Sequence, residues 1–238
     1  MDTLLEATAI NTGYGQLQVL WDTEIIVGKS ERVVLLGANG AGKTTLLKAI
    51  MGLIPLWSGS IVFDGDHLEK KRTDERFQSG VSYMSEMGVI AGLTVEENLL
   101  IGGYYLNKQA QKQQLEKMYE QFPDLKQKRK NAGGSLSGGQ RKMLGVAKAL
   151  MSQPKLLVMD EPSAGLSPLF VKEVIDFLIK STEESNLSLL IAEQNVKFLE
   201  IADRVYVLDG GRITFSGTVL ELVANDAVKR AYFGLEGS

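Results

Sequence analysis

Residues 32–45 read RVVLLGANGAGKTT, and this stretch decides the fold. Its first part, residues 32–37, is a nearly continuous apolar run that predicts a buried strand. The glycines that follow predict a loop, and Leu46, Leu47 and Ile50 then recur on one face of a helix. The order of strand, glycine-rich loop and helix is the local signature of a phosphate-binding loop.

The loop matches the pattern G-x-x-x-x-G-K-[ST]. In such a loop backbone N–H groups surround phosphates, the lysine reaches the β- and γ-phosphates, and the hydroxyl residue ligates Mg²⁺. The helix start that follows favours anions as well. The predicted phosphate-binding residues are Gly37, Asn39, Gly40, Ala41, Gly42, Lys43, Thr44 and Thr45.

A second apolar strand, residues 156–160, ends in two carboxylates, Asp160 and Glu161. Taken alone, Asp-Glu-Pro is also a good turn sequence. Beside a phosphate loop, the strand-terminal carboxylate Asp160 is expected to hold Mg²⁺. Glu161 is then expected to orient or deprotonate the attacking water, which makes Glu161 and Lys43 the predicted catalytic residues.

The remaining pattern extends the sheet in both directions. Residues 187–192 and 205–209 read as buried strands, with a hairpin to 213–215, and Ser167 is expected to begin a helix at Pro168. Short alternating runs at 3–10, 23–27 and 60–63 predict an antiparallel layer. We expect an α/β fold of the P-loop NTPase (RecA-like) class, with a mostly parallel sheet, an antiparallel β layer and an inserted α-helical subdomain. We treat 1–238 as one domain, with a core from 1–91 and 152–238 and a helical arm from 92–151.

Composition excludes several other functions. The 26 basic and 29 acidic residues give a net charge of -3, which offers no general attraction for nucleic acid. The chain has no cysteine, so disulfides and thiol catalysis are excluded. The longest uncharged runs, 7–21 and 49–63, are too short to span a bilayer, and the N-terminus lacks a signal pattern, so we expect a cytoplasmic location. The charged run from Lys70 to Arg76 is expected to be a solvated face, and His67, the single histidine, a surface residue.

Residues 136–140 read LSGGQ and open a predicted helix. A serine and two glycines at a helix start offer a second anion site, although Ser-Gly-Gly by itself is more often a simple loop. The ordered combination of GANGAGKTT, LSGGQ and LLVMDEP resembles the ATPase subunit of ABC transporters, over essentially the whole chain.

This resemblance implies ATP and Mg²⁺ as cofactors and a head-to-tail pair of ATPase subunits. It implies that Ser137, Gly138, Gly139 and Gln140 contact ATP held by the opposite subunit, and that Tyr14 stacks on adenine. Two family positions differ in this chain. Gln194, which the resemblance adds to the predicted catalytic residues, stands where a switch histidine is usual. Glu86, expected near Mg²⁺ or the water, stands near the Q-loop glutamine position. Glutamine can hydrogen-bond a phosphate but cannot carry a proton, so hydrolysis should depend more on Glu161.

Glu193-Gln194-Asn195, the segment 93–99 and the ending 228–234 are similar to LivF-type ATPases of branched-chain amino acid importers. The implied partners are a second, LivG-like or identical ATPase, membrane permeases and, indirectly, an external binding protein, with the chain on the inner face of the cell membrane. Residues 87–91 lack the arginines common in that subfamily. A urea or amide importer, and a nucleotide-gated assembly switch with little hydrolysis, stay open as alternatives.

Overall fold

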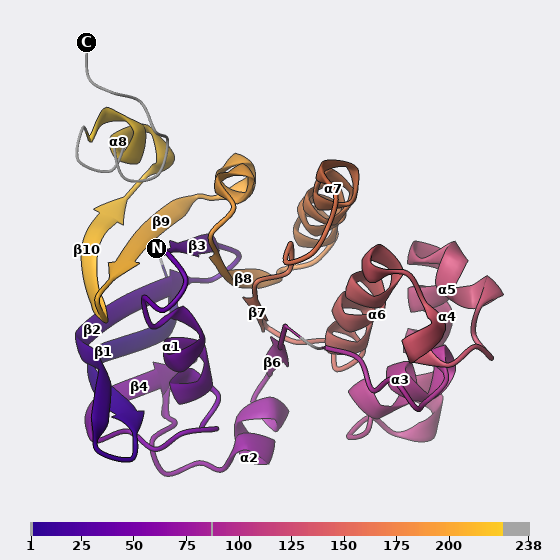
Figure 1. Cartoon of the computed structure of the whole chain (residues 1–238). Helices are drawn as coiled ribbons and strands as arrows, with labels where there is room; N and C mark the ends of the chain where they lie inside the picture. The colour runs from indigo at the N-terminus through magenta and orange to yellow at the C-terminus, as the bar shows by residue number, and fades with distance from the viewer. Residues whose placement is uncertain (1, 87, 226–238) are drawn as a thin grey trace.

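The fold contains two sheets and a group of helices beside them (Figure 1). The structure is a computed structural model that describes residues 2–86 and 88–225. Residue 87 and the ending 228–234, both used above for the subfamily comparison, lie outside the described residues. Within the described residues no helix combines the length and the hydropathy needed to cross a membrane.

The larger sheet carries the predicted parallel core. Its strand order is β10(Arg212–Gly217), β9(Arg204–Asp209), β3(Arg32–Leu36), β8(Ser188–Glu193), β7(Leu156–Asp160) and β6(Val81–Met84). All neighbouring pairs are parallel except β9 and β10, which form the predicted hairpin. The mostly parallel α/β architecture expected from the sequence is confirmed.

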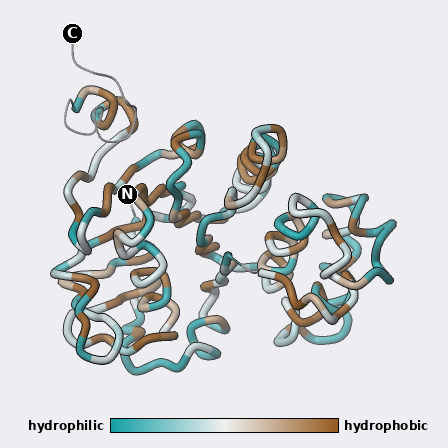
Figure 2. The backbone as a smooth tube through the Cα atoms, in the orientation of Figure 1, coloured by the Kyte–Doolittle hydropathy of each residue, from teal (hydrophilic) through white to brown (hydrophobic). Residues whose placement is uncertain are grey.

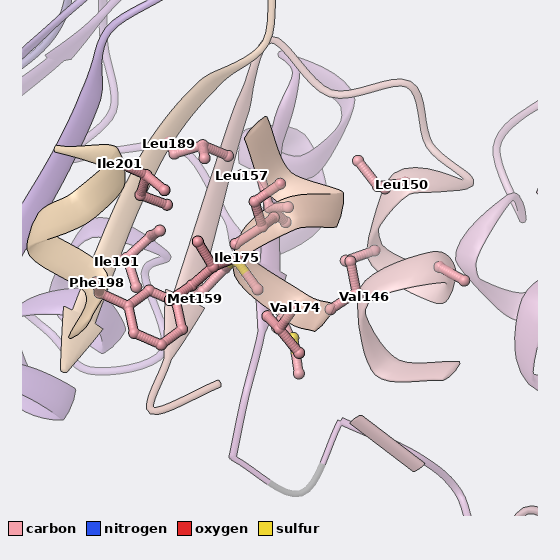
Figure 3. Packing of buried hydrophobic residues seen from close by; sticks show 14 of the residues in the cluster. Val146, Leu150, Leu157, Met159, Val174, Ile175, Leu189, Ile191, Phe198 and Ile201 are labelled. Carbon is pink, nitrogen blue, oxygen red and sulfur yellow. The ribbon is translucent and has the colours of Figure 1, made fainter. Parts of the chain in front are cut away.

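Continuous apolar strands are required because both faces of this sheet are covered. In β3, Val33 and Leu35 belong to one buried cluster, whereas Val34 and Leu36 belong to the other. Figure 3 shows part of the second cluster, in which Leu157 and Met159 from β7 lie beside Leu189 and Ile191 from β8. Helices α6(Gly138–Leu150) and α7(Pro168–Glu184) and the 3-10 segment η2(Val196–Ile201) cover that face (Figure 3).

The smaller sheet is antiparallel, with strand order β2(Leu17–Gly28), β1(Thr3–Tyr14), β4(Ser58–Phe63) and β5(Asp66–His67). Its strands β1 and β2 are longer than the alternation predicted. Helix α1(Lys43–Ile50) lies between the sheets, since Leu46, Leu47 and Ile50 pack with residues of β1, β2 and β3. The helix that follows the phosphate loop is thus held on two sides.

A helical lobe follows β6, comprising α3(Val95–Gly102), α4(Lys108–Gln121), α5(Pro123–Gln127), the 3-10 turn η1(Gly133–Ser135) and α6. Figure 1 shows α3, α4 and α5 gathered beside α6, on the side away from β1 and β2. The side chain of Thr94 caps α3 through the amide of Glu97, as a capping box should. Along the chain brown and teal segments alternate in Figure 2, so no part of this lobe is a long apolar stretch.

One local expectation is confirmed and another needs correction. As expected, Ser167 occupies the N-cap position of α7 and Pro168 begins the helix, although the Ser167 side chain makes no capping hydrogen bond. The run from Lys70 to Arg76 is not entirely a solvated face, because Arg76, in helix α2(Thr73–Gln78), is only 3% exposed. Its guanidinium donates to the carbonyls of Ala49 and Ile50 at 2.9 and 2.7 Å, which satisfies the C-terminal end of α1. His67 is exposed, as expected.

Candidate nucleotide site

The phosphate loop joins the carboxyl end of β3 to the start of α1. Gly42, at the N-cap of α1, has φ 109°, and a Cβ there would lie 2.9 Å from a methyl carbon of Leu20, so only glycine fits. The ammonium of Lys43 donates to the carbonyls of Gly37 and Ala38 at 2.9 and 3.2 Å. The loop therefore folds around its own lysine, while the first amides of α1 have no acceptor within the helix.

Asp160 lies at the carboxyl end of β7, directly opposite the start of α1. One carboxylate oxygen accepts from the Thr44 hydroxyl at 2.9 Å, and the other accepts from the Tyr83 hydroxyl at 3.0 Å. Burial raises the pKa of Asp160, and these two hydrogen bonds oppose that increase. Burial and the neighbouring Asp160 likewise raise the pKa of Tyr83, so Tyr83 stays a donor.

Glu161 turns its side chain into the phosphate loop. Its carboxylate oxygen lies 3.1 Å from the Lys43 ammonium, and its amide donates to the carbonyl of Ala192 at 2.9 Å. The backbone has φ 47°, a left-handed conformation that costs a non-glycine residue about 1–2 kcal/mol. The surrounding strands must hold this residue in place, and strained residues of this kind cluster at functional sites.

A cavity of about 510 Å³ lies beside the phosphate loop, Asp160 and Glu161. Its lining includes the predicted residues Asn39, Gly40, Gly42, Lys43, Thr44, Thr45, Glu86, Asp160 and Glu161. A second cavity of about 260 Å³ is lined by Glu161, Gln194, Ser163, Ala164, Glu193 and Asn195. Glu161 thus faces both cavities, between the phosphate loop on one side and Gln194 on the other.

The oxygen donors at the first cavity fit magnesium. The hydroxyl of Thr44 and the carboxylate of Asp160 are hard ligands already in contact, and Glu86 lines the same cavity. Among the described residues no three His, Cys, Asp or Glu side chains gather into a metal cluster. Mg²⁺ does not need one, because it retains waters and is usually held by one or two carboxylates together with substrate phosphates.

The LSGGQ segment lies elsewhere, at the start of α6. The Ser137 hydroxyl accepts from the Gln140 amide at 3.3 Å, and the Gln140 side chain accepts from the Ser137 amide at 3.2 Å. Gly139 is buried, and a Cβ there would lie 2.6 Å from the Phe170 ring, whereas Gly138 is exposed. None of residues 137–140 lines either cavity. A single chain therefore does not bring its LSGGQ segment to its own phosphate loop.

Tyr14 stands at the end of β1, with 46% of its surface exposed and the Lys48 ammonium 6.0 Å from the centre of its ring. It lines neither cavity. The ring face remains accessible for a planar partner, and its contact with adenine stays a prediction.

Sequence reasoning missed the role of Glu193 as a connecting residue. One carboxylate oxygen accepts from the Ser163 amide at 2.7 Å, and the other accepts from the amides of Gln194 and Asn195 at 3.1 and 3.2 Å. Its carbonyl accepts from the amide of Gly37 at 3.2 Å. Burial raises the pKa of Glu193. The sequence did contain a signal for this role, because an acidic residue at the end of an apolar strand is a buried charge that needs hydrogen-bond partners.

The carboxyl ends of β3, β8 and β7 meet at one edge of the parallel sheet and carry the phosphate loop, Glu193 and Asp160. This arrangement defines a P-loop NTPase, in which ligands bind beyond the carboxyl ends of the strands. Two solved structures support the fold. A nucleotide-free ATP-binding cassette of an ABC transporter has a TM-score of 0.83 at 25% identity, and an ATP-binding cassette in its ADP conformation has 0.84 at 26%. Each alignment covers 99% of this chain and 100% of the other.

The chain belongs to the ABC transporter family, whose model matches residues 20–164. Among its relatives, the high-affinity branched-chain amino acid transport ATP-binding protein BraG of Pseudomonas aeruginosa is 39% identical, over 97% of this chain and 100% of that protein. The probable branched-chain amino acid transport ATP-binding protein LivF of Archaeoglobus fulgidus is 36% identical, over 98% and 99%. The lipopolysaccharide export system ATP-binding protein LptB of Haemophilus influenzae is 33% identical, over 98% of both chains. The protein is thus an ATPase, the ATP-binding subunit of an ABC transporter.

Proposed function

We propose that this chain supplies the energy for an importer of branched-chain or other hydrophobic amino acids. The observation that supports the cargo is the identity of 36–39%, over nearly the full length, to proteins named for branched-chain amino acid transport. The chain would act at the inner face of the cell membrane, bound to permease subunits and served indirectly by an external binding protein.

In this proposal Tyr14 stacks on adenine and the phosphate loop holds the ATP phosphates. Thr44 and Asp160, with Glu86 nearby, would hold Mg²⁺, which would neutralise phosphate charge. The hydrogen bond from the Thr44 hydroxyl to Asp160 at 2.9 Å supports this set, because it brings the two oxygen ligands together.

Hydrolysis requires Lys43 and Glu161 to separate. Their ion pair of 3.1 Å holds the two groups together while no phosphate competes. A γ-phosphate draws the ammonium of Lys43 to itself, and the released carboxylate of Glu161 can then accept a proton from the attacking water. Gln194, across the second cavity from the loop, donates a hydrogen bond to the γ-phosphate but takes no proton.

The site is completed by a second subunit, either a copy of this chain or a LivG-like ATPase. Ser137, Gly138, Gly139 and Gln140 of that subunit would close on the γ-phosphate through the start of α6. The position of these residues on α6, outside both cavities of their own chain, supports a contribution in trans.

The mechanism is tested with Glu161→Gln, which keeps the size of the side chain and removes its basicity. We expect this variant to bind ATP as the native chain does and to release phosphate roughly 100- to 10,000-fold more slowly, the range that general-base removal gives. Lys43→Ala serves as the control that has lost nucleotide binding or turnover. If Glu161→Gln hydrolyses ATP as fast as the native chain, Glu161 is not the general base. If the native chain releases no more phosphate than Lys43→Ala does, the assembly switch is favoured.

The cargo is tested by uptake of labelled leucine, isoleucine and valine in source cells that lack this chain. Restoration by the native chain, but not by Glu161→Gln, is the expected result. The similarity to LptB makes an export ATPase the second candidate, at 33% identity. Unchanged uptake together with a defect in the cell envelope would favour that candidate, and a selective loss of urea or amide uptake would favour the other importer.

A further inference from the structure

Lys142, on helix α6, reaches out of the helical lobe to the nucleotide site. Its ammonium donates to the carbonyl of Glu161 at 2.9 Å and to the carbonyl of Glu86 at 3.0 Å. Both acceptors belong to segments that follow strands of the parallel sheet, β7 and β6. One side chain of the helix that starts with LSGGQ therefore holds two segments that line the cavity above Lys43.

The contact with Lys142 adds a hydrogen bond to the backbone of Glu161. The Glu161 amide donates to Ala192 in β8, and its carbonyl accepts from both the Lys142 ammonium and the Ala164 amide, the latter at 3.1 Å. Because φ of Glu161 is 47°, these contacts must maintain a conformation that the residue would not adopt by itself. The direction of the Glu161 carboxylate depends on this peptide.

Four carboxylates surround the half-buried ammonium of Lys142. Burial lowers the pKa of Lys142 below its ordinary value, and electrostatic interaction with Glu86, Glu193, Glu161 and Asp160 opposes that decrease. Apart from Lys43, Lys142 is the cation that the described residues bring to Glu161 through a hydrogen bond or an ion pair. Loss of the Lys142 ammonium would leave the negative charge of these carboxylates less neutralised.

We propose that Lys142 is a positioning residue for ATP hydrolysis, which sets the backbone of Glu161 according to the orientation of helix α6. In the proposed dimer α6 would offer its N-terminus to the nucleotide site of the partner subunit, while Lys142 lies at the site of its own chain, so a change in the orientation of α6 would move the peptide of Glu161. The inference rests on the proposed role of Glu161 as the water-orienting residue.

The test compares Lys142→Met, Lys142→Arg and Lys148→Met in the full-length chain. Lys142→Met keeps the length of the side chain and removes its donors, Lys142→Arg keeps donors, and Lys148 is a partly buried lysine of the same helix without an ammonium hydrogen bond among the described residues. We expect Lys142→Met to lower kcat roughly 10-fold or more, because small misplacement of a catalytic group has effects of that size or larger. KM and nucleotide affinity should stay within about 2-fold, since the phosphate loop is untouched.

Lys142→Arg should restore at least part of kcat, and Lys148→Met should match the native chain. Hydrogen exchange of a peptide covering residues 160–166 gives a readout that does not depend on turnover, and we expect faster exchange at the Ala164 amide in Lys142→Met. Native kcat and native exchange in Lys142→Met overturn the proposal, as does an equal loss in Lys148→Met. If the native chain itself hydrolyses no ATP, the proposed function fails, and the exchange experiment still decides whether Lys142 holds the Glu161 peptide.

Discussion

Asp160 illustrates how single residues assemble the site. Its two carboxylate oxygens have different partners, the Thr44 hydroxyl from α1 and the Tyr83 hydroxyl from β6, so it connects three elements. Burial raises the pKa of Asp160, and a cation beside it would reverse that effect by favouring the charged form. These observations agree with the proposal that Asp160 binds a metal ion.

We therefore expect Asp160→Asn to bind Mg²⁺-ATP roughly 10–100-fold more weakly, while ATP binding in the presence of a chelator stays within about 2-fold. Titration calorimetry with and without Mg²⁺ measures both. Tyr83→Phe is the matched control, because it removes one hydrogen bond to Asp160 and leaves the carboxylate. If Asp160→Asn binds Mg²⁺-ATP like the native chain, Asp160 is not a magnesium ligand.

At the scale of elements, the contact between α6 and α7 depends on Gly139, which has no side chain. A Cβ at Gly139 would lie 2.6 Å from the Phe170 ring of α7, but one at Gly138 would meet only the Gly165 carbonyl at 4.0 Å. The two adjacent glycines of the LSGGQ segment thus have different structural roles. Gly139 allows the helices to approach, and Gly138 faces outward.

Gly139→Ala should lower the free energy of unfolding by roughly 1–3 kcal/mol through overpacking. Gly138→Ala should leave it unchanged or raise it by up to about 1 kcal/mol, because alanine favours the helix. Urea denaturation compares the two, and Phe170→Leu combined with Gly139→Ala should recover part of the loss. Equal stability of the two single variants would show that Phe170 does not restrict position 139.

In the antiparallel sheet, hydrogen bonds between Glu69 and strand β4 depend on the charge of the Glu69 carboxylate and therefore on pH. Burial by itself raises the pKa of the Glu69 carboxyl, but hydrogen bonds from the Ser60 side chain and the Ile61 amide outweigh it and lower the pKa to about 2. A carboxyl pKa below its unfolded value stabilises the fold above the unfolded pKa, and this contribution is lost as the pH falls toward the folded value.

Glu69→Gln should therefore cost on the order of 2 kcal/mol at neutral pH. The difference from the native chain should shrink as the pH falls from about 4.5 towards 2. Denaturation curves at several pH values measure this, with the exposed Glu75→Gln as control. A difference that is independent of pH would mean that Glu69 acts by packing and not by its charge.

At the scale of the molecule, the phosphate loop and the LSGGQ segment belong to different parts of the chain. The loop lies at the edge of the parallel sheet, and the start of α6 lies with the helical lobe (Figure 1). In the proposed function a complete site therefore needs two subunits, with the loop of one facing the segment of the other. This arrangement makes a prediction about mixtures of defective chains.

Lys43→Ala and Ser137→Arg should each reduce ATP turnover nearly to background when present alone. An equimolar mixture should regain turnover, because one of the two sites in a mixed dimer has an intact loop and an intact LSGGQ segment. Phosphate release measured at several mixing ratios tests this. No recovery in a mixture that forms dimers would show that the two motifs do not meet between subunits.

Local sequence was sufficient for everything that depends on neighbouring residues. The apolar strand from residue 32, the glycine loop and the periodicity after Lys43 predicted the phosphate loop and the parallel sheet, because each is set by pattern within a short window. The same holds for the carboxylates at the end of residues 156–160. Contacts with ATP, Mg²⁺ and a second subunit stay predictions.

Tertiary structure decided which distant groups meet. Thr44 and Asp160 are 116 positions apart, and Lys142 and Glu86 are 56 apart, yet each pair is in hydrogen-bond contact. Arg76 reads as part of a charged surface run but is buried against the carbonyls that end α1. A sequence pattern records which face of an element is apolar, whereas the partner of a buried polar group is chosen by whichever backbone group the fold brings near it. For that reason Glu193 and Lys142 became visible only in the folded chain.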